Sequence, residues 1–123
     1  MEHEAFRRMD FTSWEVCGMF DELEFEWDTE KERENIRDHG VNFTDALEAF
    51  RDYFRVERHD DDSSHYEERY QTMGYYQGIL FVVYTERGNV VRIISARVAE
   101  PFERRIYNAN SETLYGGWQR VNP

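Results

Sequence analysis

Hydrophobic and polar residues alternate along several short stretches of the chain, and this alternation predicts β-strands. Leu23, Phe25 and Trp27 are separated by single glutamates, which is the period of two that a half-buried strand requires. Stretches rich in β-branched and aromatic residues predict further strands at 53–57, 67–75, 79–86 and 90–97. Gly78 and Gly88 fall between the last three of these strands, which are therefore expected to form a meander joined by hairpin turns.

Two helices are predicted between the first and second strands. Asp28 is a natural N-cap for a helix that includes Lys31, and Gly40 is expected to end that helix. Asn42 or Thr44 then begins a second helix. The apolar face of the second helix is formed by Phe43, Ala46, Leu47, Ala49 and Phe50.

A last helix is predicted at 101–108, because Pro101 is favoured in a first helical turn. The order β-α-α-β-β-β-β-α then indicates an α+β domain, with two helices on one face of an antiparallel sheet. The other face should be partly open and lined by polar residues. This domain is expected to span 23–108, between an N-terminal extension at 1–22 and a loose C-terminal tail at 109–123.

The charge of the chain narrows the class of its partners. The 26 acidic and 15 basic residues give a net charge of −11, which argues against a nonspecific nucleic-acid binder but fits a basic partner. A small local basic site is not excluded. The single cysteine, Cys17, allows no intramolecular disulfide, and no apolar run is long enough for a membrane span, so the cytoplasm is the expected location.

Arginines near strand ends are the leading candidates for catalytic or binding residues, because a guanidinium can form two parallel hydrogen bonds to a phosphate. Arg92 and Arg97 are five positions apart, so they should point to opposite faces of their strand unless a bulge intervenes. Arg97 shares a face with Ser95 and is the better phosphate ligand. Arg69 either lies beside Arg97 on the open face of the sheet or forms a cross-strand salt bridge. Tyr70, the next residue, should point to the face opposite Arg69.

The histidines have both structural and chemical interpretations. His39 lies in a last helical turn, where the helix dipole favours its charged form, but it could also act as a general acid or base. Lys31 either pairs with a neighbour on its helix or has a role of its own. His59 and His65 belong to an aspartate-rich loop without metal-ligand spacing, so we expect a solvated loop and no metal or other cofactor.

Many of these residues occur in one collinear order between about 24 and 107. The set consists of Phe25-Glu26-Trp27-Asp28, Lys31, Asn35, His39-Gly40-Val41-Asn42-Phe43, Ala46, Phe50, Asp52, Glu68-Arg69, Gly74, residues 80–87 and 92–97, Glu103-Arg104-Arg105 and Tyr107. No single piece is specific, but the ordered set resembles the BrnT family of toxins from type II toxin–antitoxin systems.

The resemblance implies a RelE-like fold and a metal-independent endoribonuclease that cleaves RNA and inhibits translation. It also implies a tight complex with a BrnA-like antitoxin, whose ribbon-helix-helix domain would supply the only contact with DNA. The catalytic residues that this interpretation suggests are Lys31, His39, Arg69 and Arg97. The residues that it assigns to RNA binding are Arg92, Ser95 and Tyr70.

Two positions depart from the family pattern. The family usually has a basic residue before the His-Gly pair and another after the last arginine of the strand, where this chain has Asp38 and Val98. Because two cations are missing, an alternative function is a catalytically weakened or inactive binding module. Such a module would bind a basic antitoxin or another protein partner. Phe11, Trp14 and Phe20 in the N-terminal extension also make a homodimer plausible.

Overall fold

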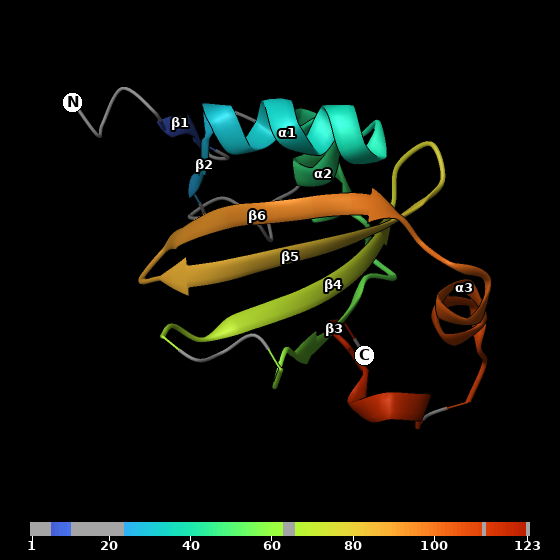
Figure 1. The fold of residues 1–123 in the computed structure, drawn as a ribbon. Helices are drawn as coiled ribbons and strands as arrows, with labels where there is room; N and C mark the ends of the chain where they lie inside the picture. The colour runs from blue at the N-terminus through green and yellow to red at the C-terminus, as the bar shows by residue number, and fades with distance from the viewer. Residues whose placement is uncertain (1–5, 11–23, 63–65, 112, 123) are drawn as a thin grey trace.

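The fold is taken from a computed structural model, which describes residues 6–10, 24–62, 66–111 and 113–122. In this part of the chain, seven strands form one sheet in the order β1-β2-β6-β5-β4-β3-β7 (Figure 1). The elements are β1 (Phe6–Asp10), β2 (Glu24–Asp28), α1 (Thr29–His39), α2 (Phe43–Ala49), β3 (Val56–His59), β4 (Arg69–Tyr75), β5 (Ile79–Arg87), β6 (Val90–Val98), α3 (Pro101–Asn108), the 3₁₀ helix η4 (Tyr115–Gly117) and β7 (Gln119–Arg120). None of the described helices is long and apolar enough to cross a membrane.

The predicted α+β class is confirmed, but the prediction of a wholly antiparallel sheet is wrong. β2 pairs with β6 in parallel, with Phe25 opposite Val91, whereas the other neighbouring strands are antiparallel. The reason is that the last strand of the meander returns beside the first predicted strand, a pairing that hydrophobic periodicity does not specify. The predicted order also lacks β1, η4 and β7.

Helix α1 is attached to the sheet through a buried amide. Asp28 caps its first turn by accepting hydrogen bonds from the backbone of Glu30 and Lys31, and Gly40 ends it with φ of 74°. The side chain of Asn35 donates to the carbonyl oxygens of Val41 and Ala96, both at 2.8 Å, and accepts from the Ala96 backbone at 3.0 Å. These bonds hold a largely polar helix against β6.

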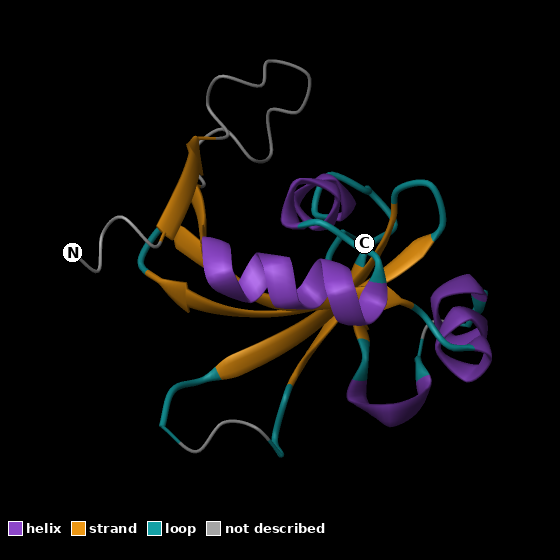
Figure 2. Ribbon diagram, turned by 45° about the horizontal axis from the view of Figure 1, so that its top comes forward, coloured by secondary structure: helices purple, strands orange, loops and turns teal. Residues whose placement is uncertain are grey.

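Helices α1 and α2 cover one face of the sheet, which we call the helix face (Figure 2). Its core is aromatic: Phe50 of the α2 C-cap contacts the rings of Phe25 and Tyr84 edge-on, each at a centroid distance of 5.0 Å. Gly74 lets α2 approach β4 closely, because a Cβ atom at that position would lie 2.1 Å from the carbonyl oxygen of Ala49.

The residues after α3 pack onto the sheet, so the prediction of a loose C-terminal tail is wrong for the described part of 109–123. Leu114 and Trp118 are buried beside Phe81 and Ile106 in a second core cluster, and β7 pairs with β3. Arg58 lies over the Trp118 ring at 4.7 Å. Of residues 1–22, the backbone of 6–10 forms β1 against β2, and the rest of that extension lies outside the described residues.

Candidate functional site

Strand β6 contains one extra residue relative to β5. Ile93 and Ser95 pair with adjacent residues of β5, which leaves Ile94 without a partner in the register. A bulge of this kind resets the alternation of side chains. Arg92 and Arg97 therefore point to the same face of the sheet, and the prediction that they face opposite ways is wrong.

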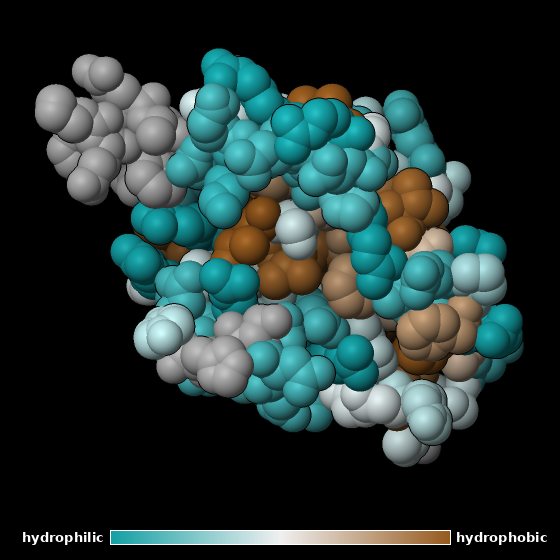
Figure 3. Space-filling model, in the orientation of Figure 1, coloured by the Kyte–Doolittle hydropathy of each residue, from teal (hydrophilic) through white to brown (hydrophobic). Residues whose placement is uncertain are grey.

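That face, which we call the arginine face, presents rows of side chains across β4, β5 and β6. The rows are Arg69–Thr85–Arg92, Gln71–Val83–Ser95 and Met73–Phe81–Arg97. Two strand spacings separate Arg69 from Arg92, so their Cα atoms are roughly 10 Å apart. Hydrophobic side chains gather over the middle of β5 and β6 with hydrophilic ones around them (Figure 3). Val83, which lies opposite Ser95 on this face, is half-buried.

Arg97 is held firmly by a carboxylate of α3. Its guanidinium donates to both oxygens of Glu103, at 2.8 and 2.9 Å, and lies 4.2 Å from the centre of the Phe81 ring. This bond raises the pKa of Arg97. Burial acts to raise the pKa of Glu103, but the hydrogen bonds from Arg97 and from the Glu100 backbone outweigh burial and lower that pKa below its ordinary value.

The other two arginines of this face also meet carboxylates. Arg92 donates to Glu26 of β2 through two nitrogens, at 2.7 and 2.8 Å, and Glu26 is only 5% exposed. Arg69 lies 3.7 Å from Glu67. The sequence did not single out Glu26 or Glu103 as counter-ions, although both belong to the collinear set. An anionic ligand on this face has to compete with these carboxylates for the guanidinium groups.

The other predicted site residues lie on the helix face. Lys31 and His39 are exposed on α1, which packs against the side of β6 that carries Ala96. Tyr70 contacts the ring of Tyr84 at 5.6 Å, on the face opposite Arg69, as strand alternation predicts. The structure therefore brings Arg69, Arg92, Ser95 and Arg97 onto one face and leaves Lys31, His39 and Tyr70 on the other.

The aspartate-rich loop is organised by a histidine. His59 meets Asp61 through Nδ1 at 2.5 Å and Glu68 through Nε2 at 2.6 Å. These two hydrogen bonds raise the pKa of His59 above its ordinary value. The two carboxylates lie against opposite nitrogens of one ring, which is the arrangement of an imidazolium between two anions.

A family model described as the ribonuclease toxin BrnT of type II toxin–antitoxin systems matches residues 27–103, more than half of the chain. The chain belongs to the BrnT family. The matched segment runs from the end of β2 to the first turn of α3, and it includes Arg69, Arg92 and Arg97. Membership places the chain among the ribonuclease toxins of type II systems and implies an antitoxin partner.

Comparison with solved structures finds similarity to the BrnT ribonuclease toxin of Brucella abortus, whose crystal structure was determined at 1.1 Å resolution. The sequence identity is 26%, the match covers 60% of this chain and 92% of that one, and the TM-score is 0.46. No curated protein matches the chain.

Asp38 and Val98, where the resemblance leads us to expect basic residues, are both exposed. Asp38 lies in the last turn of α1 and pairs with Arg37 at 3.3 Å. Val98 ends β6 opposite Leu80 and is 55% exposed. A basic residue at either position would reach solvent, so the residue present there affects the surface charge of the chain and not its core.

Proposed function

We propose that this BrnT-family chain is a metal-independent endoribonuclease that cleaves RNA on its arginine face and thereby inhibits translation. The observation that supports this site is the bulge at Ile94, which puts Arg92, Ser95 and Arg97 on the face that also carries Arg69. Guanidinium groups on a sheet face can bind neighbouring oxygens of one phosphodiester or of two successive ones.

Cleavage in this proposal follows the chemistry open to RNA without a metal. The 2′-hydroxyl loses its proton to a base and attacks the adjacent phosphorus, and the 5′-oxygen leaves with a proton from an acid. Arg69 and Arg97 stabilise the negative charge that grows on the phosphate oxygens, and removal of one such group costs about 10²–10³ in rate. Arg92 and Ser95 bind the RNA beside them.

Residues on the helix face have a secondary part in the proposal. Lys31, His39 and Tyr70 lie away from the arginine face, so they contact only RNA that extends past the edge of the sheet. In this proposal His39 reaches a proton near the scissile phosphate only where the RNA passes over that edge. Glu103 and Glu67 must release their arginines when the phosphate binds.

The test of this function is cleavage of a labelled single-stranded RNA by the purified full chain in the presence of EDTA. The proposal expects fragments that end in a 2′,3′-cyclic phosphate and a 5′-hydroxyl. Expression of the chain alone should slow growth and protein synthesis. RNA that stays intact, or cleavage that requires added Mg²⁺, would contradict the proposal.

The proposal also includes a BrnA-like antitoxin with a ribbon-helix-helix domain, through which the chain would reach DNA. A net charge of −11 favours a basic partner. The product of a neighbouring short gene should co-purify with the chain and restore growth. We further propose a RelE-like fold for 23–108, an N-terminal extension at 1–22 of which β1 joins the sheet, a cytoplasmic location and, through that extension, self-association.

A second candidate function is a catalytically weakened binding module. It is favoured by the pairing of Arg92 and Arg97 with Glu26 and Glu103, together with the acidic residue at Asp38. In this case the chain would bind the antitoxin tightly and leave RNA intact under every condition. The EDTA cleavage assay separates the two candidates.

A further inference from the structure

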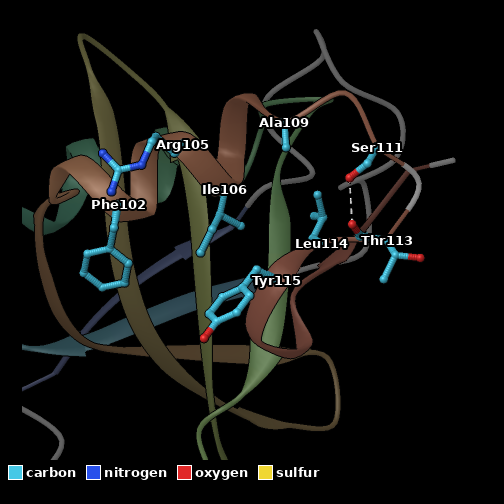
Figure 4. A pocket seen from close by; sticks show the side chains of 8 residues that line it. All are labelled: Phe102, Arg105, Ile106, Ala109, Ser111, Thr113, Leu114 and Tyr115. Atoms are coloured by element: carbon cyan, nitrogen blue, oxygen red, sulfur yellow. Dashed lines mark hydrogen bonds between the residues drawn. The ribbon is translucent and has the colours of Figure 1, made fainter.

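The residues that follow the family match build a hollow of their own. It lies between α3 and η4, has a volume of about 440 Å³, and is shown in Figure 4. Its lining consists of Phe102, Arg105, Ile106, Ala109, Ser111, Thr113, Leu114 and Tyr115. All of these except Phe102 lie beyond residue 103, where the BrnT match ends. The hollow is thus an addition to the matched segment.

Two exposed aromatic rings border this hollow above an apolar floor. Phe102 is 50% exposed and Tyr115 is 82% exposed, whereas Ile106 and Leu114 beneath them are less than 10% exposed. Exposed rings over a buried aliphatic floor offer flat surfaces on which a planar ligand can stack. The hydroxyl of Ser111 donates to the carbonyl oxygen of Thr113 at 2.7 Å and holds the far wall in place.

Arg105, which also lines the hollow and lies on the Phe102 side of it in Figure 4, differs from the arginines of the sheet. Every other described arginine from Arg33 to Arg120 has an ion pair or a hydrogen bond. Arg97, for example, is paired with Glu103, and Arg104 donates to the carbonyl oxygen of Ala99. Arg105 has neither to any described residue, and its side chain is exposed. Its guanidinium is therefore ready for an anion without displacement of a carboxylate.

Charge along the sequence favours an anionic ligand in this region. Residues 91–123 carry five arginines and three glutamates, whereas residues 1–90 carry 10 basic and 23 acidic residues. The end of the chain is thus a net cationic segment on an acidic protein. The net charge of −11 repels a polyanion at long range, so the attraction of this segment for an anion acts only over short distances.

We propose that this hollow binds one nucleotide of single-stranded RNA, with the base stacked on Phe102 and Tyr115 and the phosphate on Arg105. The inference rests on the proposed ribonuclease function, because it makes the hollow a subsite for RNA that flanks the cleavage site. A volume of about 440 Å³ lies in the range of small-ligand pockets and has room for a nucleotide. Stacking accepts any base, so this subsite adds affinity rather than sequence preference.

The test measures binding of a fluorescent 2′-O-methyl octanucleotide, which lacks the attacking 2′-hydroxyl, by anisotropy with the full chain. Tyr115→Ala should weaken binding roughly 5- to 100-fold, as expected for loss of one stacked base. The matched control is Tyr66→Ala, because Tyr66 is fully exposed and lies outside the hollow, and it should change affinity less than twofold. Tyr115→Trp should keep the affinity. Thermal unfolding of each variant checks the fold.

Arg105→Ala gives a second readout that a structural effect would not produce. Loss of one phosphate contact should lower the slope of log K against log salt by about 0.7, whereas Tyr115→Ala should leave the slope unchanged. The control is Arg33→Ala, an exposed arginine of α1. Equal affinities and equal salt slopes for the wild type and all variants would overturn the subsite. Loss of antitoxin binding by Tyr115→Ala or Arg105→Ala, with RNA binding kept, would also overturn it.

Parallel cleavage of unmodified RNA separates this inference from the proposed function. If the wild type cleaves RNA and Tyr115→Ala binds the octanucleotide normally, the subsite is wrong and the ribonuclease stands. If the wild type does not cleave and Tyr115→Ala loses binding, the subsite holds and the ribonuclease is wrong. A wild-type chain that does not bind the octanucleotide overturns the subsite whatever the cleavage result.

Discussion

Arg92 and Arg97 lie on the same face of β6 although they are five positions apart, because Ile94 is an extra residue in the strand. Each is tied to a carboxylate from a different element, Arg92 to Glu26 of β2 and Arg97 to Glu103 of α3. The arginine face is therefore fixed at both ends by ion pairs before any ligand arrives. The guanidinium groups of Arg92 and Arg97 therefore both stabilise the fold and are the groups that an anion would bind.

Replacement of Glu103 should make stability depend on pH in a defined direction. The folded pKa of Glu103 is lowered, so its contribution is present above the unfolded pKa of about 4.3 and is lost as pH falls through the folded value. Glu103→Gln should lower the free energy of unfolding by about 1–2 kcal/mol at pH 7 and by almost nothing at pH 3. The value at pH 7 is modest because Arg97 is partly exposed and water screens the ion pair. Urea unfolding at several pH values measures this, with Glu34→Gln as an exposed control. A cost that is equal at pH 3 and pH 7 would argue against the ion pair.

Asn35→Ala tests the attachment of α1 to the sheet. The substitution leaves the backbone groups of Ala96 and the carbonyl of Val41 without their partner in a buried position. We expect a loss of about 2–4 kcal/mol in the free energy of unfolding. Glu34→Ala, on the exposed side of the same helix, should change it by less than about 0.5 kcal/mol. Similar small effects for both variants would contradict the attachment through Asn35.

Gly74→Ala tests the close approach of α2 to β4. The added Cβ would lie 2.1 Å from the Ala49 carbonyl oxygen, so the two elements must separate. We expect a loss of about 3 kcal/mol, at the upper end for overpacked positions. Gly78→Ala is the comparison: its Cβ meets no atom within 4 Å, but φ of 122° strains the new residue. Its cost should be about 1–2 kcal/mol, and a larger cost for Gly78→Ala would argue against the contact.

The His59 ring should titrate above pH 6.5, since Asp61 and Glu68 both stabilise its charged form. The stabilisation that it brings is complete below the unfolded pKa and disappears as pH rises through the folded pKa. Nuclear magnetic resonance titration of the ring protons reports this value directly. Glu68→Gln and Asp61→Asn should each lower it, and a wild-type value below 6.5 would contradict the two hydrogen bonds.

Local features of the fold could be predicted from the sequence, and long-range ones could not. Asp28, Gly40 and Asn42 act as the predicted helix caps because capping depends on residues within one turn. The bulge at Ile94 and the parallel pairing of β2 with β6 depend on strands far apart in the chain. The residues of β6 alone do not indicate the extra residue, because Ile93 and Ile94 are adjacent apolar residues and either of them could face the core.

The same distinction applies to the candidate site. The sequence predicts Arg69 and Arg97 as candidate phosphate-binding cations. The carboxylate beside Arg69 is local, since Glu67 is two residues away, whereas the partner of Arg97 lies on α3. The pairing of Arg97 with Glu103 depends on where α3 folds back after β6, which neither helix caps nor periodicity determine. Burial of Trp118 likewise depends on the return of the chain end to β3.

The most direct test of the central claim compares cleavage of one RNA by the wild type, Arg97→Ala and Arg33→Ala. If Arg97 stabilises the phosphate, Arg97→Ala should lower kcat/KM at least about tenfold, while Arg33→Ala, on the helix face, retains the wild-type value. Glu103→Gln should retain activity, because it releases the guanidinium that the mechanism needs. Equal activity of Arg97→Ala and the wild type, with both proteins folded, would contradict the assignment of catalysis to the arginine face.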